Sequence, residues 1–357
     1  MGCKIVGHGK ALPELIVSND DMAKVVDTSD EWIVERTGIH NRRIALEETT
    51  TSLGTDAARN ALADAGLAAD DIDLIVCMTI SADAVVPSQA ALIKMQLGAS
   101  NAVAFDLNAA CTGCIYGMDV ASTMIEASVA SEDGSGIGHR RNAMRRALVV
   151  GAERLSRITD WTDRATCVLF GDGAGAIVLE WDDDAPGILA SFLKNTDDEA
   201  LCLTVDANHD LRPFPFGDDV RMESLGEVMD IRNDDGEFWP QLPYIRMHGQ
   251  RVFKFATAAI VEAGREVCER AGIKLEDVAC VIPHQANDRI IRFAAKKLGV
   301  PYERWQVSIG ETGNTSASSV LMALHDAYKS GRIQPGDFVM CVGFGGGLTS
   351  GALVFEA

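Results

Sequence analysis

The chain has 357 residues, of which 47% are hydrophobic and 24% charged, and its formal net charge is −20. This composition indicates a globular protein with a large core, and the negative charge argues against nonspecific nucleic-acid binding, which needs a basic surface. No stretch approaches the roughly 18 apolar residues of a membrane span. The first residues lack a basic region followed by an apolar core, so we expect no secretory signal and a cytoplasmic protein.

The first half of the chain alternates predicted strands and helices. A Ser/Thr/Asp cluster at residues 27–30 predicts the cap of a short helix that ends at Gly38. Buried strands are predicted at 74–78, 103–107, 147–151 and 176–179, with shorter ones at 5–11 and 15–17 and helices at 51–65 and 88–97. This alternation predicts an α/β fold with a largely parallel sheet.

The second half of the chain repeats the first. Residues 65–76 match residues 271–282 at an offset of 206, and residues 175–180 match residues 351–356. We therefore predict two duplicated α/β halves, at 1–181 and 245–357. Two segments do not fit the repeat: a polar, Gly-rich loop insertion at 131–142 and an irregular cover segment at 182–244.

Cys111 stands where the predicted strand at 103–107 turns into a helix. The free N–H groups and the positive end of a helix N-terminus favour an anion, so we expect a lowered thiol pKa and a nucleophile. A buried structural cysteine is the alternative. The nine cysteines are scattered and odd in number, which is typical of a reduced compartment. Cys114 completes a C-x-x-C pair, but we interpret it as a core residue one turn later.

Two further residues are predicted to approach Cys111. His284 ends a buried strand, and the duplication places that strand end beside the Cys111 helix. The same repeat predicts that a second helix opens near residues 313–316, where Asn314 lies. A cysteine, a histidine and an asparagine from three strand ends favour nucleophilic catalysis. The glycine-rich run at 343–347 follows a strand and is either an oxyanion hole or a hairpin turn.

Seven motifs, taken in order, resemble the β-ketoacyl-acyl carrier protein synthase III family of the thiolase superfamily. They are DTSDEWIVERTG (27–38), AACTG (109–113), TDR (162–164), FGDGAGA (170–176), PHQAN (283–287), GNTS (313–316) and FGGG (344–347). The resemblance implies a five-layered αβαβα thiolase-like fold, a homodimer, and condensation of an acyl-CoA primer with malonyl-acyl carrier protein. It implies no metal and no redox cofactor.

The resemblance also implies roles for individual residues. Cys111 is the acyl-accepting nucleophile, His284 and Asn314 serve malonyl decarboxylation, and the N–H groups of Cys111 and Gly346 form the oxyanion hole. The residues implied in coenzyme A binding are Trp32 and Arg164 around the adenine, Arg36 at a phosphate, and Phe253 and Asn287 along the pantetheine tunnel. Val86 stands where acetyl-preferring members often carry Phe at the closed end of the acyl pocket, which leaves room for a longer primer.

A basic cluster stands out in this acidic chain. Arg289, Arg292 and Lys296 are three and four residues apart, so they share one side of a helix, and Lys254 precedes them near the tunnel position. We expect this face to dock the acidic acyl carrier protein. Three alternatives stay open: an enzyme that primes a polyketide or quinolone pathway, a non-catalytic acyl-CoA or carrier-protein binding module, and a thiol-redox protein built on Cys111 and Cys114.

Overall fold

The computed structural model describes residues 1–132, 144–198, 200–206 and 244–357. The predicted insertion at 131–142 lies almost entirely outside these residues, as does most of the segment at 182–244. Within the described residues, no helix is both long and apolar enough to cross a bilayer.

Five strands form the first sheet, in the order β1-β7-β6-β4-β5. They are β1 (Gly2–Ala11), β4 (Leu74–Met78), β5 (Val103–Leu107), β6 (Arg146–Arg154) and β7 (Asp172–Asp182). β4 runs parallel to β5 and β6, but β7 runs antiparallel to β6 and β1. Four of the five strands, β1, β4, β5 and β6, therefore run in one direction, as predicted, and β7 is the exception. Only a 3-10 turn and the short helix α6 (Arg164–Cys167) join β6 to β7, and a parallel pair would need a full crossover.

Four strands form the second sheet, in the order β11-β12-β13-β8. They are β8 (Ile188–Asn195), β11 (Val278–Pro283), β12 (Phe338–Gly345) and β13 (Thr349–Glu356). This order matches β4-β6-β7-β1 of the first sheet, so β8 lies beside β13 as β1 lies beside β7. β8 lies within the segment that we predicted to be irregular, so part of that segment forms a strand of the second sheet.

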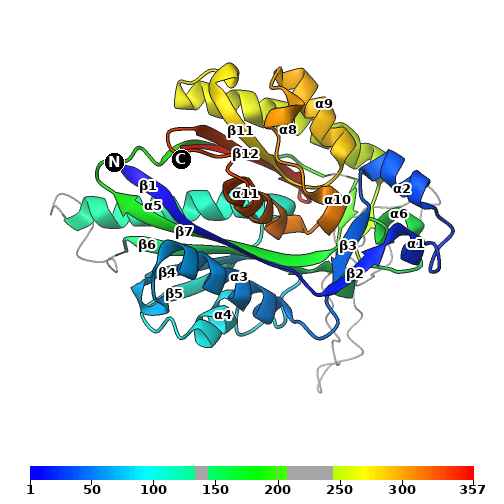
Figure 1. Cartoon of the computed structure of the whole chain (residues 1–357), viewed down its shortest axis with the longest axis horizontal. Coiled ribbons are helices and arrows are strands. Elements are labelled where there is room, and N and C mark those ends of the chain that lie inside the picture. Colours follow the sequence, from blue (N-terminus) through cyan, green and yellow to red (C-terminus); the bar gives the residue numbers. More distant parts are fainter. Residues whose placement is uncertain (133–143, 199, 207–243) are drawn as a thin grey trace, which may run out of the picture.

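The helices separate and cover the two sheets. The main helices are α3 (Thr50–Ala65), α4 (Gln89–Leu97), α5 (Gly113–Glu132), α8 (Gly249–Ala271), α9 (Asp288–Leu298) and α11 (Ser319–Lys329). In Figure 1, α3 and α4 lie below the first sheet, α5 and α11 lie between the sheets, and α8 and α9 lie above the second. Three clusters of buried apolar side chains hold the layers together: one below the first sheet, one around α5 and α11 between the sheets, and one above the second sheet. The expected αβαβα arrangement is confirmed.

Short elements gather at the end of the molecule where α2 lies (Figure 1). They are β2 (Leu15–Ser18), α1 (Asn19–Met22), α2 (Asp30–Thr37), β3 (Asn41–Ile44), β9 (Leu203–Thr204), β10 (Arg246–Met247) and α10 (Ile309–Thr312). The predicted short helix is α2: the Ser29 side chain accepts from the Trp32 N–H, and Gly38 ends the helix at φ 79°. Ser29 and Gly38 are thus the cap and the stop that the sequence predicts.

Candidate active site

Cys111 lies in a 3-10 turn (Ala110–Thr112) that links β5 to α5. Its side chain is only 8% exposed, and its Sγ lies 3.3 Å from the Oγ of Ser316. The turn packs against the end of β12, where a Cβ added to Gly345 would lie 2.7 Å from the Cys111 backbone nitrogen. Glycine at 345 therefore allows two backbones to meet at the candidate nucleophile.

The environment of Cys111 raises the thiol pKa. Burial raises it to about 11, the hydrogen bond with Ser316 opposes that shift, and the negative charge of Glu153 adds to it. Our prediction of a lowered pKa is wrong because loss of solvation outweighs the helix terminus. At neutral pH the free enzyme holds Cys111 as a thiol. Cys114 is fully buried among the side chains between the two sheets, as predicted.

His284 directly follows β11 and is almost completely buried. Its backbone N–H donates to the carbonyl of Val342 at 2.8 Å, and its Nδ1 lies 2.7 Å from the Ser319 Oγ. The ring of Phe344 packs edge-on against the imidazole, with centroids 5.4 Å apart. Burial lowers the pKa of His284 to about 3, so the imidazole is neutral at physiological pH.

Asn314 follows α10 and is held by the first half of the chain. Its backbone N–H donates to the Leu169 carbonyl at 2.9 Å, and its carbonyl accepts from the Gly171 N–H at 3.0 Å. A Cβ at Gly171 would lie 2.3 Å from the Thr312 carbonyl oxygen, which explains glycine in the FGDGAGA motif. The Asn314 Oδ1 accepts from the Ser316 N–H at 2.9 Å, so its amide N–H groups are the donors available to a ligand.

The three candidate catalytic residues converge. Asn314 is bound to Ser316, and Ser316 contacts Cys111. A Cβ at Gly343 would lie 3.3 Å from the His284 Cβ and 3.6 Å from the Thr112 Cγ2, so His284 and the turn that carries Cys111 lie on the same face of β12. Among the described residues, no group of three or more His, Cys, Asp or Glu is arranged to hold a metal ion.

The glycine-rich run is predicted to be either an oxyanion hole or a hairpin turn, and the hairpin turn is present. It forms the turn between β12 and β13, and it also lies against the nucleophile turn. The Gly346 carbonyl accepts from the Thr349 Oγ1 at 3.1 Å, and a Cβ at Gly346 would lie 3.8 Å from the Ala110 Cβ. The backbone of Gly346 is thus beside the Cys111 turn, as an oxyanion hole requires.

Trp32, Arg36 and Arg164 form one surface cluster. The guanidinium of Arg36 lies 4.7 Å from the centre of the Trp32 ring, and that of Arg164 lies 4.9 Å from it. The Arg164 Nη1 also donates to the Asp27 carbonyl at 2.9 Å. Arg36 and Arg164, which the family resemblance assigns to coenzyme A binding, therefore both lie beside the Trp32 ring.

Phe253 and Asn287 lie between that cluster and the basic face. Asn287 caps α9 by accepting from the Arg289 N–H at 2.9 Å, and its Nδ2 donates to the Arg36 carbonyl at 2.9 Å. The Arg289 guanidinium lies 5.8 Å from the centre of the half-buried Phe253 ring. Both of these predicted tunnel residues therefore lie close to α9, but Asn287 also has a structural role in joining α2 to α9.

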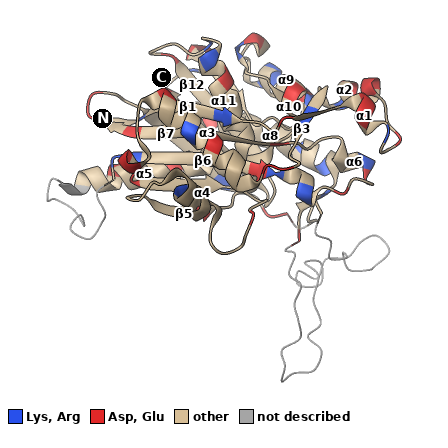
Figure 2. Ribbon diagram, turned by 60° about the horizontal axis from the view of Figure 1, so that its bottom comes forward, with Lys and Arg blue, Asp and Glu red and all other residues tan. Residues whose placement is uncertain are grey.

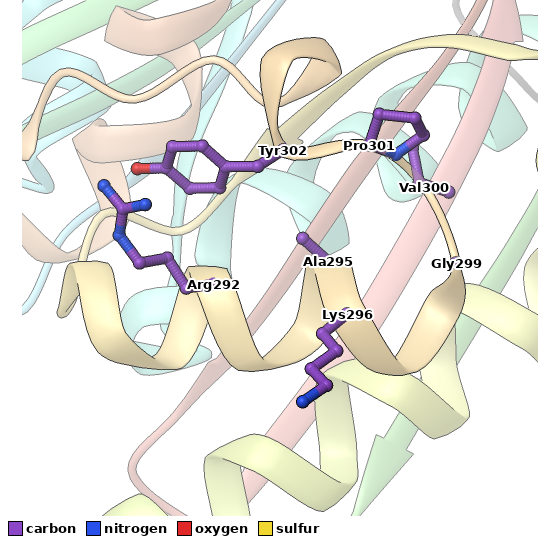
Figure 3. A pocket seen from close by; sticks show the side chains of 7 residues that line it. All are labelled: Arg292, Ala295, Lys296, Gly299, Val300, Pro301 and Tyr302. Carbon is purple, nitrogen blue, oxygen red and sulfur yellow. The ribbon is translucent and has the colours of Figure 1, made fainter.

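The basic face comprises Arg289, Arg292 and Lys296 on α9 and Lys254 on α8, and all four side chains are exposed. The Lys and Arg positions of α9 are blue in Figure 2. Arg292 is already engaged, because its Nε donates to the Asp288 carboxylate at 2.6 Å and its guanidinium lies 4.1 Å from the Tyr302 ring centre. Figure 3 shows the hollow of about 420 Å³ beside this helix, which is lined by Arg292, Ala295, Lys296, Gly299, Val300, Pro301 and Tyr302. None of the candidate catalytic residues lines it.

Val86 is 85% exposed, and it does not line the hollow beside α9. It lies in the loop between β4 and α4, next to the equally exposed Val85. In a single copy of the chain, Val86 therefore cannot close an acyl pocket.

Several residues of the site were not predicted. Ser316, Ser319, Thr349 and Glu153 all contact the candidate catalytic residues or the turns that carry them. Serine and threonine are too common to be singled out by type. One signal was available for Ser316, which lies 206 residues after Ala110, the offset at which the two halves match.

Comparison with known proteins gives one consistent result. The family described as 3-oxoacyl-(acyl-carrier-protein) synthase III matches residues 139–197, and its C-terminal portion matches residues 268–357. The β-ketoacyl-acyl-carrier-protein synthase III of Aquifex aeolicus is 42% identical over 356 residues, covering all of both chains.

Solved structures agree with that result. The crystal structure of the 3-oxoacyl-acyl-carrier-protein synthase III of Aquifex aeolicus superposes with a TM-score of 0.83 at 41% identity, and each chain is covered completely. The priming β-ketosynthase of a polyketide biosynthetic pathway superposes with a TM-score of 0.83 at 33% identity, over 99% of this chain and 96% of that one.

Two duplicated halves with a buried cysteine at a helix start between them define a thiolase-like condensing enzyme, which is an acyltransferase. The chain belongs to the β-ketoacyl-acyl-carrier-protein synthase III family.

Proposed function

We propose that this chain takes an acyl group from acyl-CoA onto Cys111 and condenses it with malonyl-acyl carrier protein, which starts fatty-acid synthesis. The observation that carries the proposal is the convergence of Cys111, His284 and Asn314, which follow β5, β11 and α10 respectively, in one buried region. A non-catalytic binding module would not need these three catalytic side chains. A redox pair of Cys111 and Cys114 is disfavoured because Cys114 is completely buried in the core. Neither half-reaction requires a metal or a redox cofactor.

In the acylation step, the Cys111 sulfur attacks the thioester carbonyl of acyl-CoA. The thiol proton leaves with the departing CoA thiolate, so the enzyme need not hold a free thiolate beforehand. The backbone N–H groups of Cys111 and Gly346 donate to the oxyanion. The α5 N-terminus contributes its positive end at the same place.

In the condensation step, the neutral His284 and the Asn314 amide donate to the thioester carbonyl of malonyl-acyl carrier protein. These hydrogen bonds stabilise the enolate that remains when carbon dioxide leaves, and the enolate carbon attacks the acyl-cysteine. This role requires the imidazole hydrogen on Nε2. That tautomer follows if the Ser319 hydroxyl, which already accepts from the Gln285 N–H at 3.3 Å, donates to the His284 Nδ1.

Coenzyme A binding is assigned to the cluster around Trp32. An adenine between Trp32 and Arg164 needs the two planes roughly 7 Å apart, twice the contact distance of carbon atoms. Their present separation of 4.9 Å means that the Arg164 guanidinium swings outwards when the nucleotide enters. Arg36 then meets a phosphate, and Phe253 and Asn287 flank the pantetheine chain.

The acyl carrier protein is assigned to the basic face on α8 and α9. Arg289, Lys296 and Lys254 are exposed cations in an acidic chain, and the hollow beside α9 is lined mainly by apolar atoms. Arg292 contributes less than we expected from the sequence, because Asp288 offsets its charge.

We further propose a homodimer formed along β5. This strand is an edge of the first sheet in a single chain, and Val103 on it is 37% exposed. Val85, Val86 and Met95, nearby in sequence, are also exposed. A second copy would cover this edge. Val86 would then line the acyl pocket of the partner, which reconciles its predicted role with its exposure.

All nine cysteines of the chain are free thiols, which supports a reducing cytoplasm.

Whether the enzyme primes fatty acids or a polyketide depends on the primer, and a synthase of each kind is similar to this chain. Incubation with a panel of acyl-CoAs, followed by malonyl-acyl carrier protein and mass analysis of the carrier-bound product, tests the proposal. A β-ketoacyl product supports it, and acylation without condensation contradicts it.

A further inference from the structure

A buried carboxyl group lies behind the active site. Glu153, near the end of β6, is completely inaccessible to solvent. It accepts hydrogen bonds from the residues that follow β4: the Ser81 hydroxyl at 2.5 Å, the Thr79 hydroxyl at 3.2 Å and the Ile80 N–H at 3.2 Å. The backbone N–H of Ala317 donates to the same carboxyl group. Glu153 thus joins a turn of the first half to a turn of the second.

The hydrogen bond from the Ala317 N–H connects Glu153 to the nucleophile through the neighbouring residue. Ala317 directly follows Ser316, whose hydroxyl contacts the Cys111 thiol at 3.3 Å. Two residues before Glu153, a Cβ added to Gly151 would lie 2.7 Å from the Ala317 carbonyl oxygen and 2.8 Å from the Ser318 Cα. β6 therefore holds the turn Ser316–Ser318 by close backbone packing and by the Glu153 carboxyl group.

The charge of this carboxyl group is not neutralised by its hydrogen-bond donors. All four donors are neutral groups, and the guanidinium of the adjacent Arg154 donates instead to the carbonyls of Ala45 and Leu46. The titratable groups that face Glu153 are the thiols of Cys77 on β4 and Cys111. Burial raises the pKa of Glu153 to about 7, and its negative charge raises the pKa of both thiols.

We propose that Glu153 is a positioning residue that holds the Ser316 hydroxyl against Cys111 and tunes the reactivity of that thiol through its own charge. The proposal rests on Cys111 being the nucleophile of the proposed function. Protonated Glu153 leaves Cys111 easier to ionise, and ionised Glu153 makes it harder. The pH dependence of the Cys111 reaction rate should therefore show two ionisations: that of Glu153 near neutral pH and that of the thiol itself.

The test measures alkylation of Cys111 by iodoacetamide between pH 6 and 9, read as modification of the Cys111 peptide by mass spectrometry. Glu153→Gln keeps the size and removes the charge. At pH 6, where most wild-type Glu153 is protonated, both proteins should react at similar rates. At pH 8 and above, the variant should react roughly three- to tenfold faster, which is the change in thiolate fraction for half a unit to one unit of pKa. A ratio that is the same at every pH would overturn the proposal.

Three further variants keep the test decisive if Glu153→Gln does not fold. Glu153→Asp keeps the charge on a shorter side chain, so it should keep the wild-type pH dependence but react several-fold more slowly, and a wild-type rate would overturn the positioning role. Ser316→Ala removes the contact with the thiol and should slow alkylation at pH 8, and an unchanged rate would count against the proposal. Glu126→Gln, at an exposed position further along α5, is the control and should match the wild type.

This readout uses neither acyl-CoA nor carrier protein. If the pH signature is present but Cys111 is not acylated, the proposed function fails and the inference about Glu153 stands. If Cys111 is acylated normally and the signature is absent, the inference fails alone.

Discussion

Ala110 and Ser316 adopt the same left-handed backbone conformation, with φ of 46° and 47°. Each begins a 3-10 turn that leads into a helix packed between the two sheets, and the two positions are 206 residues apart. A left-handed conformation is unfavourable for a side chain with a Cβ and persists only where its surroundings enforce it. The duplicated halves have therefore kept one strained turn each, of which the first presents Cys111 and the second presents the serine that contacts it.

The two half-reactions should separate in variants of the condensing pair. His284→Ala and Asn314→Ala should still accept an acyl group on Cys111, because neither side chain serves that step. Condensation with malonyl-acyl carrier protein should fall roughly 100- to 1,000-fold, the usual effect of losing a donor to an oxyanion. Rapid-quench assays of each step check this. His325→Ala, at a half-buried histidine that contacts His8, should keep both steps, and a wild-type condensation rate in either test variant would make that residue structural.

Stability below neutral pH should depend on His284. The folded imidazole stays neutral down to about pH 3, whereas the unfolded one binds a proton below about pH 6.5, so the unfolded state binds more protons between these values. The free energy of unfolding should therefore fall as the pH drops through this window. Between pH 7.5 and 5.5, His284→Asn should lose about 1.4 kcal/mol less than the wild type. Urea unfolding at one protein concentration measures this, and equal losses would refute it.

Docking of the carrier protein should depend on charge at Arg289 and Lys296. The double substitution Arg289→Glu and Lys296→Glu should lower turnover of malonyl-acyl carrier protein by roughly tenfold and remove most of its salt dependence. Acylation by free acyl-CoA should change much less. Lys274→Glu reverses one charge in the same way at an exposed lysine beyond the far end of α8, and it should have little effect. Equal loss with both substrates would mean damage to the coenzyme A site instead.

Primer length should respond to the residue at position 86. Val86→Phe should shift preference toward acetyl-CoA by roughly 1–3 kcal/mol, the usual scale for crowding one methylene. Sedimentation analysis should find a dimer for both the wild type and the variant, because the pocket would be completed by the second copy. An unchanged chain-length profile in a dimeric variant would show that the pocket ends elsewhere.

The order of layers and the position of the nucleophile could be predicted because both follow from local patterns. Strand and helix periodicity, the cap at Ser29 and the stop at Gly38 depend on neighbours in sequence, and the 206-residue repeat turns those elements into two packed halves. Cys111 and His284 then follow strands that the repeat brings together, whereas Asn314 follows the short helix α10.

The remaining features depend on contacts that a sequence does not contain. The direction of β7 follows from a connection too short to cross over, and β8 joins the second sheet through pairing with β13, far along the chain. The Cys111 pKa rises because neighbouring elements exclude water, which outweighs the local helix terminus. Ser316, Ser319 and Glu153 act by proximity, and nothing in their residue type marks them.

The central claim is that Cys111 alone carries the acyl group, and intact mass after incubation with an acyl-CoA panel tests it most directly. The wild-type chain should gain the mass of one acyl group. Cys111→Ser should gain none, and Cys114→Ser, folded as judged by circular dichroism, should gain it as the wild type does. A mass shift that persists in Cys111→Ser, or one that disappears in folded Cys114→Ser, would contradict the account.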